Sequence, residues 1–296
     1  MSATTMREVF ARVLRTGLAD DPRIAAVIAE ISRDVLPEHE RVVNVGIREQ
    51  AMVGVGAGLA LTGLRPVIHS YAPFLVERPY EQLKLDLGHQ DLGAVLVGIG
   101  GSYDDPGLGR THQSPADVAL IDTLPGWTVH VPGHPDEVEP LLTAALARDD
   151  RTYLRLSLRT NAAPLPVVEG FTEVRRGGAG VVIAVGPVLD NVLAAVAELD
   201  VTVLYATTVR PFDAAGLRRA VAHARPDVLL VEPYLEGTSA HRVSQALADE
   251  PHRLRSLGVR RDEELRAYGT TDDHDSAHEL DPVGVREAAR RLFGGR

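Results

Sequence analysis

Short apolar runs alternate with segments of helical periodicity along almost the whole chain of 296 residues. The runs Ala94–Ile99 and Val181–Val185 are almost wholly apolar, whereas residues 7–18 and Pro282–Phe293 carry apolar side chains at helical spacing. Strands of a parallel sheet are covered by helices on both faces, so they read as continuous apolar runs. The pattern therefore predicts an α/β protein built on mostly parallel sheets.

The alternation is interrupted by one stretch without periodicity, which contains Pro164 and Pro166. A chain of this length is enough for two domains. We expect one α/β domain over residues 1–163, a linker over 164–177 and a smaller α/β domain over 178–296.

Composition disfavours several classes of binding partner and excludes the chemistry that needs cysteine. The formal net charge of −10 disfavours nucleic acids and anionic membranes as partners, because both require basic surface. Cysteine is absent, which excludes disulfides, thiolate metal sites and a cysteine nucleophile on this chain. We find neither the apolar core of a signal peptide nor a run long enough to span a membrane. These features predict a cytoplasmic protein that binds no nucleic acid and no membrane.

One carboxylate stands at a predicted strand-to-helix junction. Glu49 follows the apolar run at 42–45 and opens a helix, predicted over 48–61, that is rich in glycine and alanine. Glycines let another backbone approach closely, so this helix could hold a buried acid against a cofactor at a subunit interface. The structural alternative is a carboxylate that only gains from the helix dipole.

Two further segments follow predicted strands. Residues 70–78 include Tyr71 and Phe74, which can stack on a flat heterocycle or pack in the core. A loop rich in Gly, Asp and Pro ends in His112 and Gln113, which can bind a ligand or decorate the surface. Ligands of open α/β sheets bind at the carboxyl ends of the strands, where both segments should lie.

Several common motifs are missing. The chain has no Gly-x-Gly-x-x-Gly after its first strand, no phosphate-binding Gly-x-x-x-x-Gly-Lys-Ser/Thr loop and no Gly-x-Ser-x-Gly elbow. Residues 272–275 with His278 have the composition of a metal site, but acids and histidines are common at surfaces. We therefore predict a solvated loop there and no metal site on this chain.

Taken together, the segments resemble a known family. The resemblance rests on these residues: Asn-Val-Gly-Ile-Arg-Glu-Gln at 44–50, the segments 70–78 and 111–113, and, in the second domain, 208–213 and 231–233. The chain resembles the C-terminal half of transketolases, which is a pyrimidine-binding domain of the thiamine-diphosphate-binding fold followed by a smaller C-terminal domain. The resemblance extends to deoxyxylulose-phosphate synthases and to β subunits of 2-oxoacid dehydrogenase E1 components.

The resemblance implies thiamine diphosphate as the cofactor. Glu49 matches the glutamate that bonds N1′ of the aminopyrimidine, and a buried acid at that position can share a proton with it. Phe74, or else Tyr71, should stack on the pyrimidine, and Ile47 should contact the cofactor. His112 and Gln113 match substrate-binding positions, with His112 a candidate proton donor. Arg155 or Arg159 is the candidate for a substrate phosphate.

The resemblance also implies a partner. The family binds the diphosphate and Mg²⁺ through a Gly-Asp-Gly motif on another domain, and this motif is absent here. The chain therefore looks like one subunit of a split transketolase that transfers two-carbon ketol units between sugar phosphates or to a related acceptor. An N-terminal transketolase subunit should supply the diphosphate-binding domain and most Mg²⁺ contacts, in an α2β2 assembly. The alternatives are a β subunit of an E1-like enzyme, a deoxyxylulose-phosphate-synthase-like enzyme, or a non-catalytic assembly subunit.

One position departs from the family pattern. Transketolases commonly have Asp four residues before the loop histidine, where this chain has Leu108. Asp104 or Asp105 could replace it from a rearranged loop. The departure leaves the sugar donor and acceptor open.

Overall fold

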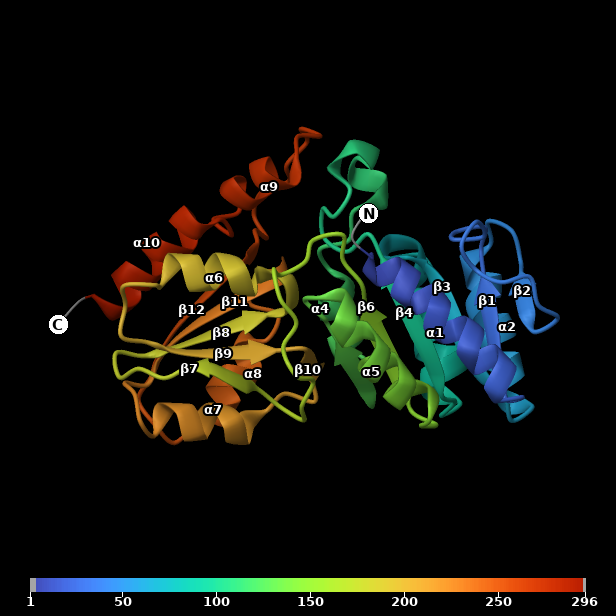
Figure 1. The fold of residues 1–296 in the computed structure, drawn as a ribbon, viewed down its shortest axis with the longest axis horizontal. Helices are drawn as coiled ribbons and strands as arrows, with labels where there is room; N and C mark the ends of the chain where they lie inside the picture. The colour runs from blue at the N-terminus through green and yellow to red at the C-terminus, as the bar shows by residue number, and fades with distance from the viewer. Residues whose placement is uncertain (1–3, 295–296) are drawn as a thin grey trace.

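The computed structural model describes residues 4–294 as two α/β halves that lie side by side (Figure 1). Residues 1–3 and 295–296, which the predicted domains include, lie outside the described residues. The first half contains, in chain order, α1 (Met6–Asp20), β1 (Ile24–Ile28), β2 (Val42–Asn44), α2 (Glu49–Leu61), β3 (Arg65–Tyr71), η1 (Pro73–Glu77), α3 (Tyr80–Gln82), η2 (Leu83–His89), β4 (Ala94–Ile99), η3 (Pro106–Leu108), η4 (Arg110–His112), α4 (Asp117–Asp122), β5 (Trp127–His130), α5 (Pro135–Leu146) and β6 (Arg151–Arg155).

The second half begins after a stretch without regular structure. Its elements are β7 (Thr172–Arg175), β8 (Val181–Val185), η5 (Gly186–Val188), α6 (Leu189–Ala195), β9 (Thr202–Ala206), β10 (Thr208–Arg210), α7 (Ala214–Val221), β11 (Asp227–Leu235), α8 (Ala240–Ala246), β12 (Arg253–Val259), α9 (Thr271–Ala277) and α10 (Pro282–Phe293).

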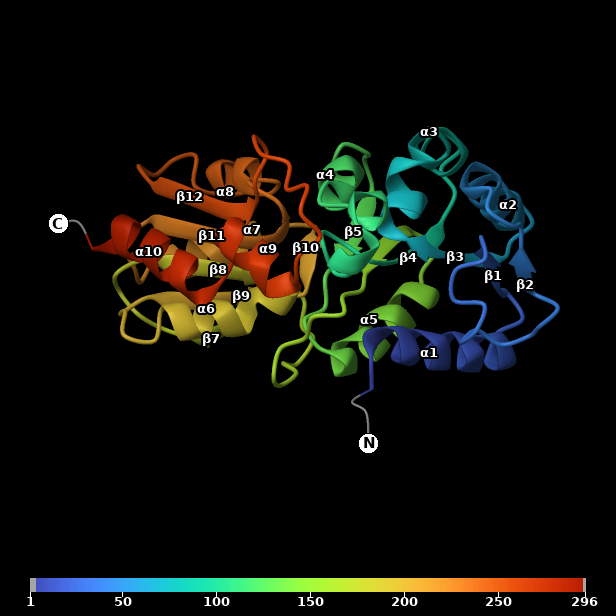
Figure 2. The ribbon, with the colours of Figure 1, turned by 90° about the horizontal axis from the view of Figure 1, so that it is seen from above.

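The first half supplies six strands of a seven-stranded sheet in the order β10-β5-β6-β4-β3-β1-β2, which is parallel except for β10. Strand β4 explains how helices cover both faces, because successive side chains of a strand point to opposite sides. Val95 and Val97 pack into the core beneath α1 and α5, whereas Ala94 and Leu96 pack on the side of α2 and α4. Figure 2 shows this layering, with α1 and α5 on one face and α2, α3 and α4 on the other.

The second half is a five-stranded sheet in the order β12-β11-β8-β9-β7, in which β7 is antiparallel to β9. The side chains of β8 alternate in the same way. Val182 and Ala184 pack in the core with α6 and α10, and Val181 and Ile183 pack in the core with α7 and α8. The α/β prediction is therefore confirmed, and both sheets are largely parallel.

Three elements differ from the sequence-based expectations. Strand β10 belongs to the second half of the chain but pairs with β5 of the first sheet. Strand β7 lies inside the segment expected to be a linker. The prediction of a solvated loop at 272–275 is wrong, because these residues lie in α9, which Thr270 caps and which buries His274 and Asp275.

The two halves of the chain pack against each other at an interface, which we call the seam. The Tyr205 hydroxyl donates to Glu137 Oε2 at 2.7 Å, and the Arg210 guanidinium pairs with Asp122. One apolar core runs through both halves, with Val129 and Ile183 among its members. Within residues 4–294, none of the helices is both long and apolar enough to cross a bilayer.

Candidate active site

Glu49 is the first residue of α2 and only 2% exposed. Its Oε2 lies 2.7 Å from Arg78 Nη1, and among residues 4–294 no donor is bonded to Oε1. The helix N-terminus favours a negative charge at this position. Helix α2 packs so closely on β3 that a Cβ at Gly56 would come within 2.5 Å of Ile68 Cδ1. The acid is therefore held by a rigid element, with one carboxylate oxygen left for a ligand.

Three rings gather next to this acid. Tyr71 ends β3, Phe74 lies in the π-helical turn η1, and His112 ends η4. Ring centroids are 5.1 Å apart for Phe74 and His112 and 5.3 Å apart for Tyr71 and His112, both with edge-to-face geometry. Arg78 connects the rings to the acid, because its Cζ lies 4.2 Å from the Phe74 centroid. Glu49, Arg78 and the three rings thus form one continuous row.

Two backbone features shape this row. Gly100 has a φ of +67°, and a Cβ there would lie 2.3 Å from Tyr71 Cδ1, so the loop after β4 passes directly over the tyrosine ring. Ile47 follows Gly46, whose φ is +70°, and stays 73% exposed. An apolar side chain this exposed beside a buried acid suits a surface that a second molecule covers.

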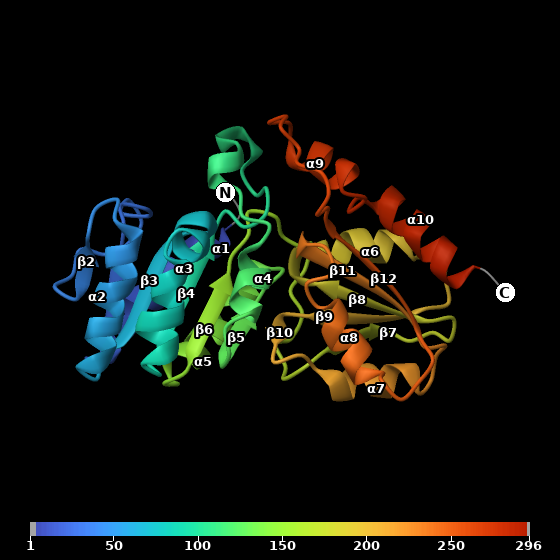
Figure 3. The same ribbon diagram turned by 180° about the vertical axis from the view of Figure 1, so that it is seen from behind.

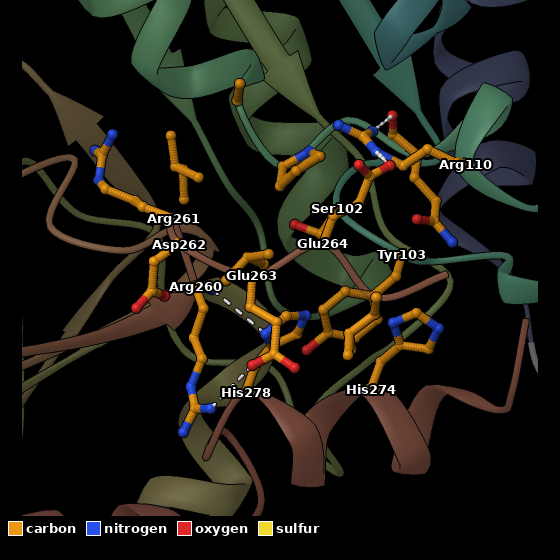
Figure 4. A pocket seen from close by; sticks show the side chains of 16 residues that line it. Ser102, Tyr103, Arg110, Arg260, Arg261, Asp262, Glu263, Glu264, His274 and His278 are labelled. Carbon is orange, nitrogen blue, oxygen red and sulfur yellow. Dashed lines mark hydrogen bonds and ion pairs between the residues drawn. The ribbon is translucent and has the colours of Figure 1, made fainter. Parts of the chain in front are cut away.

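The loop over residues 100–114 is fastened to the second half of the chain. The Tyr103 ring lies 4.8 Å from the His274 ring and 5.5 Å from the His278 ring, stacked on both (Figure 4). Its hydroxyl donates to Asp275 Oδ1 at 2.7 Å, and Arg159 bonds the other oxygen of the same carboxylate. Burial raises the pKa of Tyr103 well above its ordinary value, so the hydroxyl stays a donor.

Two more contacts fasten the same loop closer to His112. A Cβ at Gly109 would lie 2.7 Å from Tyr268 Cε1, and Arg110 Nε lies 3.4 Å from Glu264 Oε1. Gln113 lines the cavity of about 350 Å³ between this loop and the segment that leads to α9. Figures 1 and 3 show the loop and that segment side by side above the two sheets. The second half therefore holds the loop that carries His112.

Two predicted substrate arginines lie apart from the row. Arg155 is 1% exposed, and its guanidinium bonds Asp117 Oδ2 and Ser102 Oγ, each at 2.7 Å. Arg159 is the partner of Asp275 described above. Both cations are thus bonded to protein groups, whereas Glu49, Phe74, Tyr71 and His112 belong to the row.

Asp104, one of the two loop aspartates that could replace the aspartate missing at Leu108, is engaged within the protein. Asp104 accepts hydrogen bonds from Ser157 Oγ at 2.6 Å and from the Leu158 amide at 2.9 Å, and burial raises the pKa of its carboxyl group. Leu108 itself is 41% exposed. The loop thus presents an apolar side chain at the family's aspartate position.

Sequence reasoning missed the role of Arg78. This residue closes the segment 70–78, and a helical turn brings it beside Phe74, four positions earlier. That spacing is the signal that could have identified the contact. Within residues 4–294, no group of three or more acidic, histidine or cysteine side chains is placed to hold a metal ion.

Comparisons with known proteins point in one direction. Residues 2–162 match the family described as the transketolase pyrimidine-binding domain. A protein from Rhodococcoides fascians, described as an uncharacterized 33.6 kDa protein in the fasciation locus, is 52% identical over 98% of this chain and 96% of its own length. One of the subunits of the apulose-4-phosphate transketolase of Actinobacillus succinogenes is 28% identical over 87% of each chain.

A solved structure has the same fold. A split-gene transketolase, described as an inactive β4 tetramer, superposes with a TM-score of 0.84 at 21% identity over 99% of both chains. The chain also matches 1-deoxy-D-xylulose-5-phosphate synthases of Parasynechococcus marenigrum and Symbiobacterium thermophilum at 31% and 30% identity, over 86% and 98% of its own length. It spans less than half of the length of these synthases, at 42% and 47%.

Proposed function

The chain belongs to the family of the transketolase pyrimidine-binding domain, and we propose that it is the pyrimidine-side subunit of a split, thiamine-diphosphate-dependent transketolase. The observation that carries the proposal is the buried Glu49, which keeps one carboxylate oxygen without a partner among the described residues, beside a row of aromatic rings. Relatives described as transketolase subunits, aligned over most of this chain, support the same proposal.

The residues fit the pyrimidine half of the cofactor. Glu49 Oε1 would exchange a proton with a ring nitrogen, while Arg78 keeps the other oxygen in place. Phe74, with Tyr71 as the alternative, would hold the flat heterocycle, and the exposed Ile47 would pack against the cofactor. When bound, thiamine diphosphate supplies the carbanion chemistry of ketol transfer.

His112 is the proposed contact to the substrate. It lies in edge-to-face contact with both Phe74 and Tyr71, so its ring position is fixed relative to the proposed pyrimidine site. A histidine can donate a proton to a substrate oxygen near neutral pH. Gln113 would bind a substrate hydroxyl. Arg159 remains the candidate for a phosphate only if that group displaces Asp275, and the buried Arg155 is better explained as the partner of Asp117.

The diphosphate and its Mg²⁺ would be held mainly on an N-terminal transketolase subunit, in an α2β2 heterotetramer. The absence of a Gly-Asp-Gly motif supports this division. The split-gene transketolase that shares the fold is described as inactive when four β subunits assemble alone, which supports the need for a partner. We propose sugar phosphates as substrates, and the cytoplasmic location stays a prediction.

A second candidate is a synthase-like condensation. The deoxyxylulose-phosphate synthases are slightly more similar in sequence than the split transketolase relatives, at 31% against 28% identity. The match to 87% of the length of a separate transketolase subunit favours ketol transfer. Assays with a ketose donor and with pyruvate would separate the two activities.

The proposal is tested by calorimetric titration of thiamine diphosphate and Mg²⁺ into this chain, into the co-expressed diphosphate-domain protein of the neighbouring gene, and into the pair. We expect tight Mg²⁺-dependent binding by the pair, together with ketol transfer that neither protein performs alone. Tight binding by this chain alone would contradict the shared site. A pair that binds the cofactor but turns over only pyruvate would favour the second candidate.

A further inference from the structure

A second cavity lies at the seam between the two halves, away from the candidate active site. Its volume is about 670 Å³, within the usual range of small-molecule sites, which often occur between domains. Its walls include Trp127 at the start of β5, the end of β10 and parts of α7 and α8. The strands β3 to β6 are parallel, so the start of β5 lies at the edge of the sheet opposite to Tyr71 and Gly100. Figure 3 shows β10 at this seam.

The cavity is cationic although the protein is acidic. Arg148, Arg210, Arg218 and Arg242 line it, and Asp122 is the one carboxylate among its lining residues. The whole chain has 41 acidic residues and 31 basic ones, so this excess of arginine is a local feature. A cleft lined by one sign of charge concentrates ions of the opposite sign.

Part of the hydrogen-bonding capacity of these arginines is not used by the protein, although Arg148 Nε pairs with Asp150 Oδ2 at 2.9 Å. Arg210 is fully engaged, with Asp122, Ser239 Oγ and backbone carbonyls. In contrast, Arg218 donates through Nε to the Ala246 carbonyl at 2.9 Å, and its terminal nitrogens have no partner within the described part of the chain. Arg242 reaches Asp122 with Nη2 at 3.4 Å, and its buried Nε has no partner there either.

The aromatic wall adds a third unused donor. Trp127 is 7% exposed, and no acceptor is found for its buried Nε1 among residues 4–294. Phe212 and Pro211 line the same cavity and are apolar. An arginine-lined cavity in which the terminal nitrogens of Arg218 are not bonded to the described part of the protein, beside an aromatic wall, suits a ligand that has anionic acceptors and an apolar part.

We propose that this cavity binds an organic phosphate, with the phosphate between Arg218 and Arg242 and the organic part against Trp127 and Phe212. Arginine matches phosphate because its planar fork donates two parallel charge-assisted hydrogen bonds. The site is independent of the proposed cofactor chemistry and lies at the other edge of the sheet. Its ligand would contact both halves of the chain and would therefore stabilise the seam.

Trp127 makes the proposal directly testable, because it is the sole tryptophan of the chain. The full-length protein is titrated with ADP, pyrophosphate and adenosine at constant ionic strength, and the intrinsic fluorescence is followed. We expect a saturable change with ADP and pyrophosphate and none with adenosine. Tighter binding of ADP than of pyrophosphate is expected because the organic part contacts the aromatic wall.

Two variants locate the site. Arg218→Ala should weaken binding about tenfold, since a charge-assisted hydrogen bond is lost. Arg291→Ala, an exposed arginine of α10 paired with Glu287, should bind like wild type. Circular dichroism melts confirm that each variant folds. The proposal is overturned if neither phosphate compound gives a saturable change, if Arg218→Ala titrates like wild type, or if Arg291→Ala weakens binding equally.

Discussion

Arg78 Nη1 lies 2.7 Å from Glu49 Oε2, and the same guanidinium lies over the Phe74 ring. One cation therefore fixes both the proposed proton carrier and the proposed stacking ring. Its own side chain is 38% exposed, whereas that of Glu49 is 3% exposed, so water screens the pair only from the arginine side.

Removing this cation should leave a buried carboxylate without its charge partner. We expect Arg78→Ala to lower the free energy of unfolding by about 1–3 kcal/mol, less than a fully buried pair because Arg78 is partly solvated. Urea denaturation measures the loss. In a Glu49→Gln background the same substitution should cost less, and an equal cost in both backgrounds would contradict the coupling.

Glu49→Gln should abolish proton exchange while keeping the shape of the side chain. We expect ketol transfer by the reconstituted pair to fall about 100-fold or more, with the assembly unchanged in size-exclusion chromatography. Glu81→Gln, at an exposed glutamate of α3, is the matched control and should stay active. Activity that survives Glu49→Gln would refute the proposed role of this acid.

Tyr103→Phe keeps the ring against the two histidines but removes the hydroxyl that bonds Asp275. We expect a loss of about 1 kcal/mol and faster amide exchange across residues 100–114, measured by hydrogen–deuterium exchange. Tyr80→Phe removes the hydrogen bond to Thr123 elsewhere in the same half and should leave exchange in the loop unchanged. If both variants loosen the loop alike, the fastening by α9 is not specific.

Gly109 has φ +71° and ψ −173°, a backbone region that only glycine adopts readily. Gly109→Ala should therefore cost about 1–3 kcal/mol in thermal or urea unfolding. Part of that cost comes from the Tyr268 ring, so adding Tyr268→Ala should restore some stability. No recovery in the double variant would assign the whole cost to the backbone.

Stability should depend on pH through Glu232. Burial raises the pKa of its carboxyl group to about 7 from the ordinary 4.5, although Ser239 donates hydrogen bonds to it. Between these two values the unfolded chain has released the proton and the folded chain still holds it. The stabilising contribution is thus complete below pH 4.5 and is lost as the pH rises through about 7.

Glu232→Gln removes this titration. We expect its stability relative to wild type to improve by on the order of 3 kcal/mol between acidic and alkaline pH, measured by urea unfolding across the range. A constant difference between the two proteins at all pH values would refute the raised pKa.

Local patterns were enough to predict the alternating strands and helices and to place Glu49, Phe74 and His112 at one edge of a sheet, but not the contacts of Arg78. Continuous apolar runs such as Val181–Val185 are typical of strands buried on both faces, and Glu49, Phe74 and His112 each follow a strand. Because the carboxyl ends of parallel strands share one edge, their meeting follows from the chain order.

The remaining features depend on contacts between distant segments. Strand β10 is three residues long, and its pairing with β5 is visible only after both halves are placed. Residues 272–275 are polar and read as surface, yet α9 buries His274 and Asp275 because Tyr103 and Arg159 supply their partners from distant parts of the chain. Long-range contacts also engage Arg155 with Asp117 and Arg159 with Asp275.

Strand β10 also limits how the chain can be divided. It covers the outer edge of β5, so a fragment that ends before residue 208 would leave an open strand edge, which is a template for aggregation. During synthesis, that edge stays open until β10 has left the ribosome. A proteolytic cut between the halves would likewise not yield two independent modules, because the first sheet would keep a strand of the second fragment.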